Sequence, residues 1–427
     1  MIKWGAALTA CVAAIAAIWW CWPASEPYRF APARFTLGEG VTPQSFQIGS
    51  HLVALSAEGG ARLTITGPDG VLFDSGPGRA FIVAARGAVR YGAHHGMYQM
   101  RDTVDRACTD QVLGQPRVRG EDIVIPTTLV CPDGLIDATL TLDPSPADPH
   151  ALLFTATLSA EARARGYNRI GVSAASTAQE HVFGLGTQFS KFNLKGEAVP
   201  VIVSEQGIGR GREPLTRLIN LVVPGAGGLW HTTYAPAPGF VTNQGHTLFI
   251  QSYEPLLFDF RAAEAITTLS LSPMLKGSFA KRATPQAAVE SLTAQSGRMQ
   301  RPPAWSQQGA IVGLQGGTDI VRPIVDKALK DGVPVKGVWL QDWQGQRITS
   351  NGKRLWWNWV LDEDRYPDWH TMVSDWRARG IRTLVYINPF LVDVAADLPG
   401  RRNLYAEARD QGLLITTKAG TPYLIDS

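Results

Sequence analysis

A cluster of aromatic and polar residues in the last quarter of the chain contains the side chains best suited to binding chemistry. Arg354 carries a planar guanidinium that stays charged at any working pH and offers several N–H donors. Trp357 adds one indole N–H on a flat apolar ring, and Gln341 adds an amide that can donate. Fixed donors of this kind suit a permanent oxyanion, and a flat ring suits one face of a sugar. A structural alternative stays open, in which Arg354 pairs with Asp362 or Glu363 on the surface. In that alternative Trp356, Trp357 and Trp359 are ordinary core aromatics.

Short apolar runs flank this cluster and predict the strands that position it. They cover residues 310–314, 335–340 and 381–387. Helical patterns separate them at residues 319–330 and 367–380, and the second has Pro near its start and Gly at its end. This alternation of strands and helices predicts a parallel α/β unit.

Polar residues stand at the end of each predicted strand, namely Gln315, Gln341 and Asn388. Because binding groups of parallel sheets gather at the carboxyl ends of the strands, we expect these side chains to face one common mouth. The connection over residues 342–364 is far longer than the usual length of about two to six residues. Long structured connections at that edge are commonly functional, so this one is the leading candidate for a binding segment.

The same residues resemble a known family. Gln-Asp-Trp at residues 341–343 is followed by Lys-Arg at 353–354 and Trp-Asn-Trp at 357–359. Together with residues 183–189, 204–210, 313–318 and 386–389, this pattern resembles glycoside hydrolase family 31 and, within it, the sulfoquinovosidases. The resemblance extends over about residues 180–427, in order. It departs at Thr187, where the family usually has Glu, so a contact made by that Glu is not carried over.

The resemblance implies hydrolysis of α-linked sulfoquinovosides, which are sugars with a sulfonate on carbon 6. It also implies that Gln341, Arg354 and Trp357 bind the sulfonate, which agrees with the donor chemistry of these residues. Trp356 and Trp359 are expected to be packing residues.

A second group of candidates could reach sugar hydroxyls. In the C-terminal region these are Asp342 and Gln315, and in the N-terminal region they are Glu205, Gln206 and Arg210 on a possible active-site loop. For Asp342 the alternative is an Asx cap or a contact that orients Arg347. For residues 207–211 the alternative is a glycine turn. A phosphate cradle is excluded because no strand precedes and no helix follows in the way that a dinucleotide fingerprint needs.

No residue of this chain is predicted to be catalytic. Family 31 enzymes are retaining hydrolases, which use two carboxylates about 5 Å apart. The family places both on later barrel strands, and this sequence ends before a fourth strand. Residues 301–427 therefore predict an incomplete (β/α)8 TIM barrel of about three βα units. We expect such a fragment to be insoluble or inactive alone, because a parallel sheet with an open edge leaves apolar surface uncovered.

Residues 28–300 predict an N-terminal β-sandwich, which the resemblance identifies as galactose-mutarotase-like. Alternating segments at residues 51–56, 62–66, 137–142 and 152–159 read as strands. A helix is expected at residues 285–299.

Residues 1–27 predict a signal peptide or an N-terminal membrane anchor, because Lys3 precedes an apolar stretch over residues 4–24. The body of the protein would then be exported, either to the periplasm or anchored in the inner membrane with the body outside the cytoplasm. Export makes a disulfide between Cys108 and Cys131 possible, with two reduced buried thiols as the alternative.

The formal net charge of +3 comes from spread Lys and Arg residues, so nothing indicates nucleic acid. The 8 histidines show no metal-binding spacing, and we expect no metal and no cofactor. The expected partners are a small carbohydrate and, through the first residues, a membrane. Two alternative functions stay open: a family 31 α-glucosidase for neutral glycosides, and a non-catalytic, membrane-tethered sugar-binding remnant.

Overall fold

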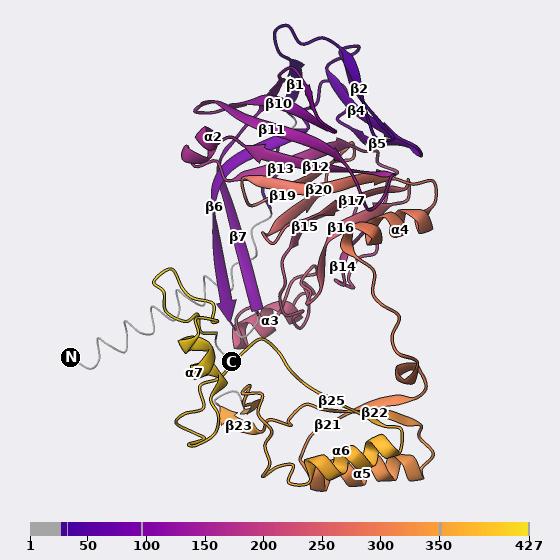
Figure 1. Ribbon diagram of the computed structural model, residues 1–427. Coiled ribbons are helices and arrows are strands. Elements are labelled where there is room, and N and C mark those ends of the chain that lie inside the picture. The colour runs from indigo at the N-terminus through magenta and orange to yellow at the C-terminus, as the bar shows by residue number, and fades with distance from the viewer. Residues whose placement is uncertain (1–26, 32, 95–96, 350–351, 426–427) are drawn as a thin grey trace, which may run out of the picture. The chain divides into compact units, whose positions relative to one another are not determined.

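The protein is described by a computed structural model that covers residues 27–31, 33–94, 97–349 and 352–425 (Figure 1). The chain divides into two compact units after Arg298, close to the predicted boundary at residue 300. The predicted leader or anchor over residues 1–27 lies almost wholly outside the described residues. None of the helices in the described ranges is long and apolar enough to cross a membrane.

The first unit is built mainly from antiparallel sheets (Figure 1). The largest has 10 strands, and its main path runs through β1 (Arg34–Leu37), β8 (Asp110–Leu113), β10 (Asp122–Cys131), β11 (Gly134–Pro144), β12 (Ala151–Leu158), β20 (Met274–Lys281), β17 (His246–Ile250), β16 (Pro236–Thr242) and β14 (Val182–Gly186). The tenth strand, β9 (Arg117–Arg119), pairs with β10 off this path. Within this sheet β1 and β8 are parallel.

Two further sheets complete the first unit. A 6-stranded sheet has the order β15 (Ala198–Val201), β18 (Leu256–Asp259), β19 (Ala265–Ser270), β13 (Arg169–Ala175), β6 (Ile82–His94) and β7 (Met97–Ala107). A 4-stranded sheet has the order β2 (Gln44–Ile48), β3 (His51–Ser56), β4 (Arg62–Gly67) and β5 (Gly70–Asp74). The strands predicted from alternation at residues 51–56, 62–66, 137–142 and 152–159 correspond to β3, β4, β11 and β12.

One hydrophobic core joins these sheets because their strands bury alternate residues. In β10 every second side chain is buried, from Ile123 to Cys131, as a sheet with one covered face requires. Phe154 of β12 stacks on Phe279 of β20 with ring centroids 4.3 Å apart. Fully burying such a ring contributes about 1.5–3 kcal/mol, so this core dominates the stability of the unit.

The described residues of the first unit form three α-helices. They are α2 (Ala160–Ala164), α3 (Leu215–Val222) and α4 (Pro285–Ser296). The predicted helix at residues 285–299 is confirmed as α4, which Thr284 caps by accepting a hydrogen bond from the N–H of Ala287. Residues 207–211 lie between β15, which ends at Val201, and α3, which begins at Leu215. Neither element directly adjoins the glycine segment as a dinucleotide fingerprint requires, and no side chain caps the start of α3.

The second unit contains a short parallel sheet, as predicted (Figure 1). Its order is β21 (Ala310–Leu314), β22 (Val335–Leu340) and β25 (Arg382–Val385), and both pairings are parallel. The crossovers contain α5 (Thr318–Lys330) and α6 (Trp369–Ala378). The remaining elements are the 3-10 helix η1 (Ala304–Gln307), the hairpin strands β23 (Gln346–Thr349) and β24 (Gly352–Leu355), and α7 (Leu404–Asp410).

The two crossover helices lie side by side and are linked by ion pairs. Arg322 of α5 pairs with Asp375 of α6, and Arg379 at the end of α6 pairs with Asp326 of α5 at 2.7 Å. Beneath them Val325 and Trp376 pack against Val338 of the central strand. This small core holds β22 and therefore the start of the long connection that follows it.

The disulfide between Cys108 and Cys131 is present in the structure, with Cα atoms 4.1 Å apart. It joins the residue after β7 to the last residue of β10, two strands of different sheets. Both cysteines belong to the common core, so the bond connects sheets that already pack together.

We predict that replacing both cysteines, as Cys108→Ala with Cys131→Ala, lowers the free energy of unfolding by about 3 kcal/mol. A cross-link that closes a loop of this length restricts the unfolded chain by roughly that amount. Urea unfolding monitored by fluorescence measures the change. Dithiothreitol should destabilise the wild type and leave the double variant unaffected, and equal sensitivity of both would refute the prediction.

Candidate functional site

Two glutamines meet at the carboxyl ends of the first two strands of the parallel sheet. Gln315 follows β21 and Gln341 follows β22, and Nε2 of Gln315 donates to Oε1 of Gln341 at 2.5 Å. The predicted common edge is therefore confirmed for this pair. Asn388, after β25, instead donates to the hydroxyl of Tyr386 at 3.0 Å and accepts from the N–H of Phe390 at 2.8 Å. Its side chain is engaged by its own loop.

Asp342 is fully buried, with 0% of its surface exposed. Its Oδ1 accepts from the hydroxyl of Tyr366 at 2.6 Å. Its Oδ2 accepts from Nε of Arg365 at 2.6 Å and from the N–H of Gly316 at 2.9 Å. The predicted role of Asp342 as a sugar ligand is not supported by this arrangement, because both oxygens are occupied inside the protein. Its ion-pair partner is Arg365, not the Arg347 that the sequence suggested.

Tyr366 is buried beside this carboxylate. Burial raises the pKa of its hydroxyl, and the hydrogen bond to Asp342 raises it further. The hydroxyl therefore remains a donor across the working pH range, and Asp342 keeps a fixed partner.

The hairpin β23–β24 presents Arg354, which is exposed. The register places Arg354 directly opposite Arg347, and like charges in that position repel each other. In residues 299–349 and 352–425, no carboxylate forms a salt bridge with Arg354. The alternative partner Asp362 instead binds Arg401 at 3.0 Å. Arg354 is thus a cation that the described part of this unit does not neutralise.

Trp357 and Trp359 both adopt positive φ angles, of 45° and 47°. This left-handed conformation costs an L-residue roughly 1–2 kcal/mol, and for a bulky aromatic it requires support from its surroundings. Asn358, between them, provides that support. It is buried, donates to the carbonyl of Arg402 at 2.7 Å and accepts from the N–H of Leu404 at 3.1 Å. Strain of this kind, held in place by neighbours, is typical of binding segments.

The two tryptophan rings lie in different surroundings. Trp357 is half-buried, with its ring centroid 5.5 Å from that of Phe390. Among the described residues, none accepts a hydrogen bond from its indole N–H. Trp359 donates its indole N–H to the carbonyl of Phe390 at 3.2 Å. Trp356 is buried against the guanidinium of Arg347. The indole N–H of Trp357 is therefore available to a ligand, whereas Trp356 and Trp359 serve packing.

The predicted loop of the first unit is held by its own side chains. Arg210, at φ 52°, donates to the carbonyls of Gln188 and Trp230, the latter at 3.0 Å. Glu205 accepts from the hydroxyl of Tyr234, and the carbonyl of Gln206 accepts from Thr232 at 2.7 Å. Arg210 thus ties together two of the family-like segments, and burial lowers its pKa. Nearby, burial and the charge of Arg210 lower the pKa of His231 to about 4.

The sequence did not identify Gln346, Arg365 or Tyr366 as part of this site. Nε2 of Gln346 donates to Oε1 of Gln315 at 2.9 Å, and Oε1 of Gln346 accepts from Arg365 at 3.2 Å. Only long-range contacts connect these residues, so no local spacing could have revealed them.

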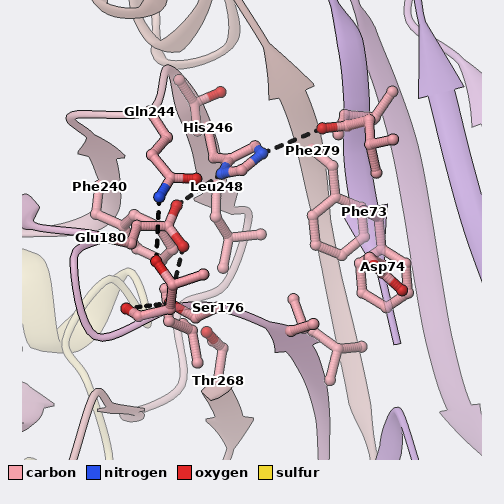
Figure 2. A pocket seen from close by; sticks show the side chains of 18 residues that line it. Phe73, Asp74, Ser176, Glu180, Phe240, Gln244, His246, Leu248, Thr268 and Phe279 are labelled. Carbon is pink, nitrogen blue, oxygen red and sulfur yellow. Dashed lines mark hydrogen bonds and ion pairs between the residues drawn. The ribbon is translucent and has the colours of Figure 1, made fainter. Parts of the chain in front are cut away.

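The first unit also contains a cavity of about 350 Å³, and none of the site residues described so far lines it (Figure 2). Its walls are largely apolar and include Phe73, Phe240 and Phe279. At its polar end Glu180, which is 2% exposed, accepts from His246 Nδ1 at 2.6 Å and from Ser176 at 2.7 Å. These charged groups satisfy each other. Within the described residues no group of three or more His, Cys, Asp or Glu could hold a metal ion.

His246 has an acceptor at each ring nitrogen (Figure 2). Nδ1 faces Glu180, and Nε2 lies 3.1 Å from the carbonyl oxygen of Val71. Each contact forms when the ring nitrogen concerned carries a proton. Burial opposes ionisation of Glu180, but the hydrogen bonds from His246 and Ser176 and the charge of His246 outweigh it and hold the pKa below its ordinary value of 4.5.

The second unit matches a known catalytic domain. Residues 300–426 match the TIM-barrel domain of glycosyl hydrolases family 31. This part of the chain is therefore similar to glycoside hydrolase family 31.

Three similar proteins are named sulfoquinovosidases. The sulfoquinovosidase of Escherichia coli (strain K12) is 34% identical over 260 residues, which are 61% of this chain and 37% of that protein. The sulfoquinovosidase of Agrobacterium fabrum (strain C58) is 30% identical over 259 residues, which are 61% of this chain and 38% of that protein. The solved GH31 family sulfoquinovosidase from E. rectale, in complex with an aza-sugar inhibitor, has a TM-score of 0.73 and 27% identity, covering 87% of this chain and 52% of that chain. The chain thus spans well under two thirds of each relative.

We predict that Glu180→Gln lowers the free energy of unfolding at pH 7 by about 1.5–3 kcal/mol, the range for hydrogen bonds to a charged group. Because the folded pKa of Glu180 is depressed, its contribution is present above pH 4.5 and is lost as the pH falls through the folded value. The difference from wild type should therefore shrink below pH 4.5.

Urea unfolding at pH 7, 5 and 3.5 measures this difference. Glu58→Gln, at an exposed turn, is the matched control and should leave stability unchanged. A difference that stays constant down to pH 3.5 would show that the carboxylate does not stabilise the cavity as described.

Proposed function

We propose that this chain provides the sulfonate-binding part of a retaining α-glycoside hydrolase that releases sulfoquinovose from α-sulfoquinovosides. The sulfonate would be bound by Gln341, Arg354 and Trp357. The match of residues 300–426 to the family 31 TIM-barrel domain and the relatives called sulfoquinovosidases support the reaction and the substrate class. Within this proposal the first unit is a galactose-mutarotase-like sandwich and the second is the first part of a (β/α)8 barrel.

The observation that carries this proposal is the position of Arg354. It is an exposed guanidinium with no salt-bridge partner in the described residues of its unit, and it faces a second arginine across the hairpin. An anion bound nearby would relieve this repulsion. A sulfonate offers three acceptor oxygens and a permanent charge, which match a planar donor fork.

Trp357 supports the same ligand. It lies three residues after Arg354 in the sequence, its indole N–H is available, and its backbone is held in a strained conformation. Gln341 stands at the end of β22, at the carboxyl edge where ligands bind to parallel sheets. The three side chains therefore combine a charge, a single directed donor and an amide.

The nucleophile and the acid/base carboxylate are proposed to lie outside residues 1–427. Asp342 is the carboxylate closest to the proposed ligands along the chain, and it is fully buried in contacts of its own. Nothing in its arrangement allows it to attack an anomeric carbon.

We also propose that the protein is exported, to the periplasm or as an inner-membrane-anchored protein. The disulfide favours an oxidising compartment. Protease protection in spheroplasts of cells that express the tagged chain would test this location.

Two other functions make different demands on these residues. An α-glucosidase for neutral glycosides would not need an unneutralised Arg354. A membrane-tethered sugar-binding protein would need no carboxylates at all, and sequencing the locus beyond codon 427 separates this possibility from a hydrolase. An open frame that continues into further barrel strands bearing aspartates favours the hydrolase.

We predict that Arg354→Ala weakens sulfoquinovose binding by about tenfold or more, as expected for hydrogen bonds to a charged group, and leaves glucose binding nearly unchanged. Arg354→Lys should recover only part of the affinity, because Lys lacks the planar fork. Isothermal titration calorimetry with both sugars measures the two affinities.

Lys353→Ala is the matched control, since Lys353 is the preceding residue and pairs with Ile348 on the other face of the hairpin. It removes the same charge from the same strand. Equal losses for Lys353→Ala and Arg354→Ala, or equal losses for sulfoquinovose and glucose, would contradict a specific sulfonate contact.

A further prediction concerns turnover. Residues 1–427 should bind sulfoquinovose, detected as an increase in melting temperature, but should release no 4-nitrophenol from 4-nitrophenyl α-sulfoquinovoside. The Escherichia coli relative serves as the active control in the same assay. Turnover by the chain alone would show that a catalytic carboxylate lies within these residues.

A further inference from the structure

Four side chains form one continuous line of hydrogen bonds behind the proposed sulfonate ligand Gln341. Arg365 donates to Oε1 of Gln346 at 3.2 Å, and Nε2 of Gln346 donates to Oε1 of Gln315 at 2.9 Å. Nε2 of Gln315 then donates to Oε1 of Gln341 at 2.5 Å. We call these four residues the glutamine relay. It joins the ends of β21 and β22, the start of β23 and the segment before α6.

The relay has a direction that its chemistry fixes. A guanidinium only donates, so Gln346 must turn its carbonyl oxygen toward Arg365. The NH2 group of Gln346 is then directed to Gln315, whose carbonyl oxygen accepts it. Gln315 repeats the arrangement toward Gln341. The NH2 group of Gln341 therefore lies at the free end of the line, with its carbonyl oxygen already occupied.

Arg365 cannot easily reverse this direction, because it is anchored. Its Nε donates to the buried carboxylate of Asp342, and its carbonyl oxygen accepts from the N–H of Thr318 at 3.1 Å. Gly317 permits this approach: at φ 86°, a Cβ on Gly317 would lie 2.5 Å from the same carbonyl oxygen. The backbone and the side chain of Arg365 are thus both held.

We propose that the Asp342–Arg365 ion pair acts through Gln346 and Gln315 to make Gln341 present its NH2 group to the ligand, which selects a sulfonate over a neutral hydroxyl group. This inference rests on the proposed function, because it assumes that Gln341 binds the sulfonate. Gln346 and Arg365 are then positioning residues for anion selectivity. They do not touch the sugar.

The selectivity follows from what each ligand can do. Sulfonate oxygens only accept hydrogen bonds, so a carbonyl oxygen in place of the NH2 group would repel them. The hydroxyl on carbon 6 of a neutral hexose can both donate and accept, so it tolerates either orientation of the amide. A fixed direction of the relay therefore matters for one ligand and hardly for the other.

Gln346→Glu tests the relay by reversing it. A carboxylate at position 346 only accepts, so Gln315 would turn its NH2 group toward it and its carbonyl oxygen toward Gln341. Gln341 would then donate to Gln315 and present its own carbonyl oxygen to the ligand. We expect sulfoquinovose affinity to fall by at least about tenfold and glucose affinity by less than about twofold, in calorimetric titrations of the full chain.

Two further variants separate the effect of hydrogen-bond direction in the relay from the effect of the added negative charge. Ile348→Glu places the same charge on the same strand outside the relay, at an exposed side chain, and should have a much smaller effect on sulfoquinovose. Gln346→Met breaks the line without adding charge, so both amides can turn freely, and it should give an intermediate loss. Far-UV circular dichroism and melting temperature establish that each variant folds.

The outcomes distinguish the relay from the proposed function. If wild type prefers sulfoquinovose and Gln346→Glu abolishes that preference beyond Ile348→Glu, the relay is supported. If wild type prefers sulfoquinovose and Gln346→Glu lowers both affinities equally, or matches Ile348→Glu, the relay is refuted while the proposed function stands. If wild type shows no preference, both are overturned.

Discussion

The carboxylate of Asp342 has no exposed surface, and the connection from β22 to α6 is organised around it. It fixes Arg365 and Tyr366 from one end of that connection, and the N–H of Gly316 from the neighbouring strand end. An ionised group so deeply buried is tolerated only when hydrogen bonds and an opposite charge compensate its lost hydration. Removing any partner leaves the others incorrectly placed, so the two strand ends and the loop depend on one another.

This mutual dependence explains how a long connection can hold its side chains in defined positions. The hairpin β23–β24 and the two left-handed tryptophans project from a segment with little regular structure of its own. The conformation of the segment is fixed instead by two buried residues: Asp342 at its start, and Asn358 between the two tryptophans. Side chains that contact solvent, such as Arg354, can then stay unpaired without the loop losing its shape.

Sequence alone predicted the parts of this unit that depend on local patterns. The strands at residues 310–314 and 335–340 have the predicted bounds. Each is a short apolar run between glycine, proline and polar residues, so the strand has few other places to begin or end. The hairpin β23–β24 was missed because its short strands are polar and largely exposed, without alternating burial. The helix α3 was missed because it has only 8 residues and no side-chain cap.

The residues of the site divide in the same way, into those that a local pattern predicts and those that it does not. Gln315 and Gln341 could be placed together from the rule for strand ends, whereas Arg365 could not, since its link to Asp342 spans 23 residues with no periodic signal. The family resemblance identified side chains that could touch a ligand, but not those that orient them. Nor does any pattern predict φ 45° for Trp357, because bulky aromatics rarely adopt it and only the surrounding hydrogen bonds allow it.

An amide is a weak choice for recognising an anion unless its orientation is fixed, since its two ends are nearly equal in size and opposite in polarity. A lysine in place of Gln341 would need no such control, but it would bring a second full charge near Arg354. A glutamine whose oxygen is already occupied behaves as a donor without that charge. The Asp342–Arg365 ion pair then has a reason to lie three glutamines away from the ligand: it supplies direction to the amides while its own charges remain compensated by each other. Under this arrangement, selectivity for the sulfonate comes from hydrogen-bond direction together with the guanidinium of Arg354, rather than from a large excess of positive charge.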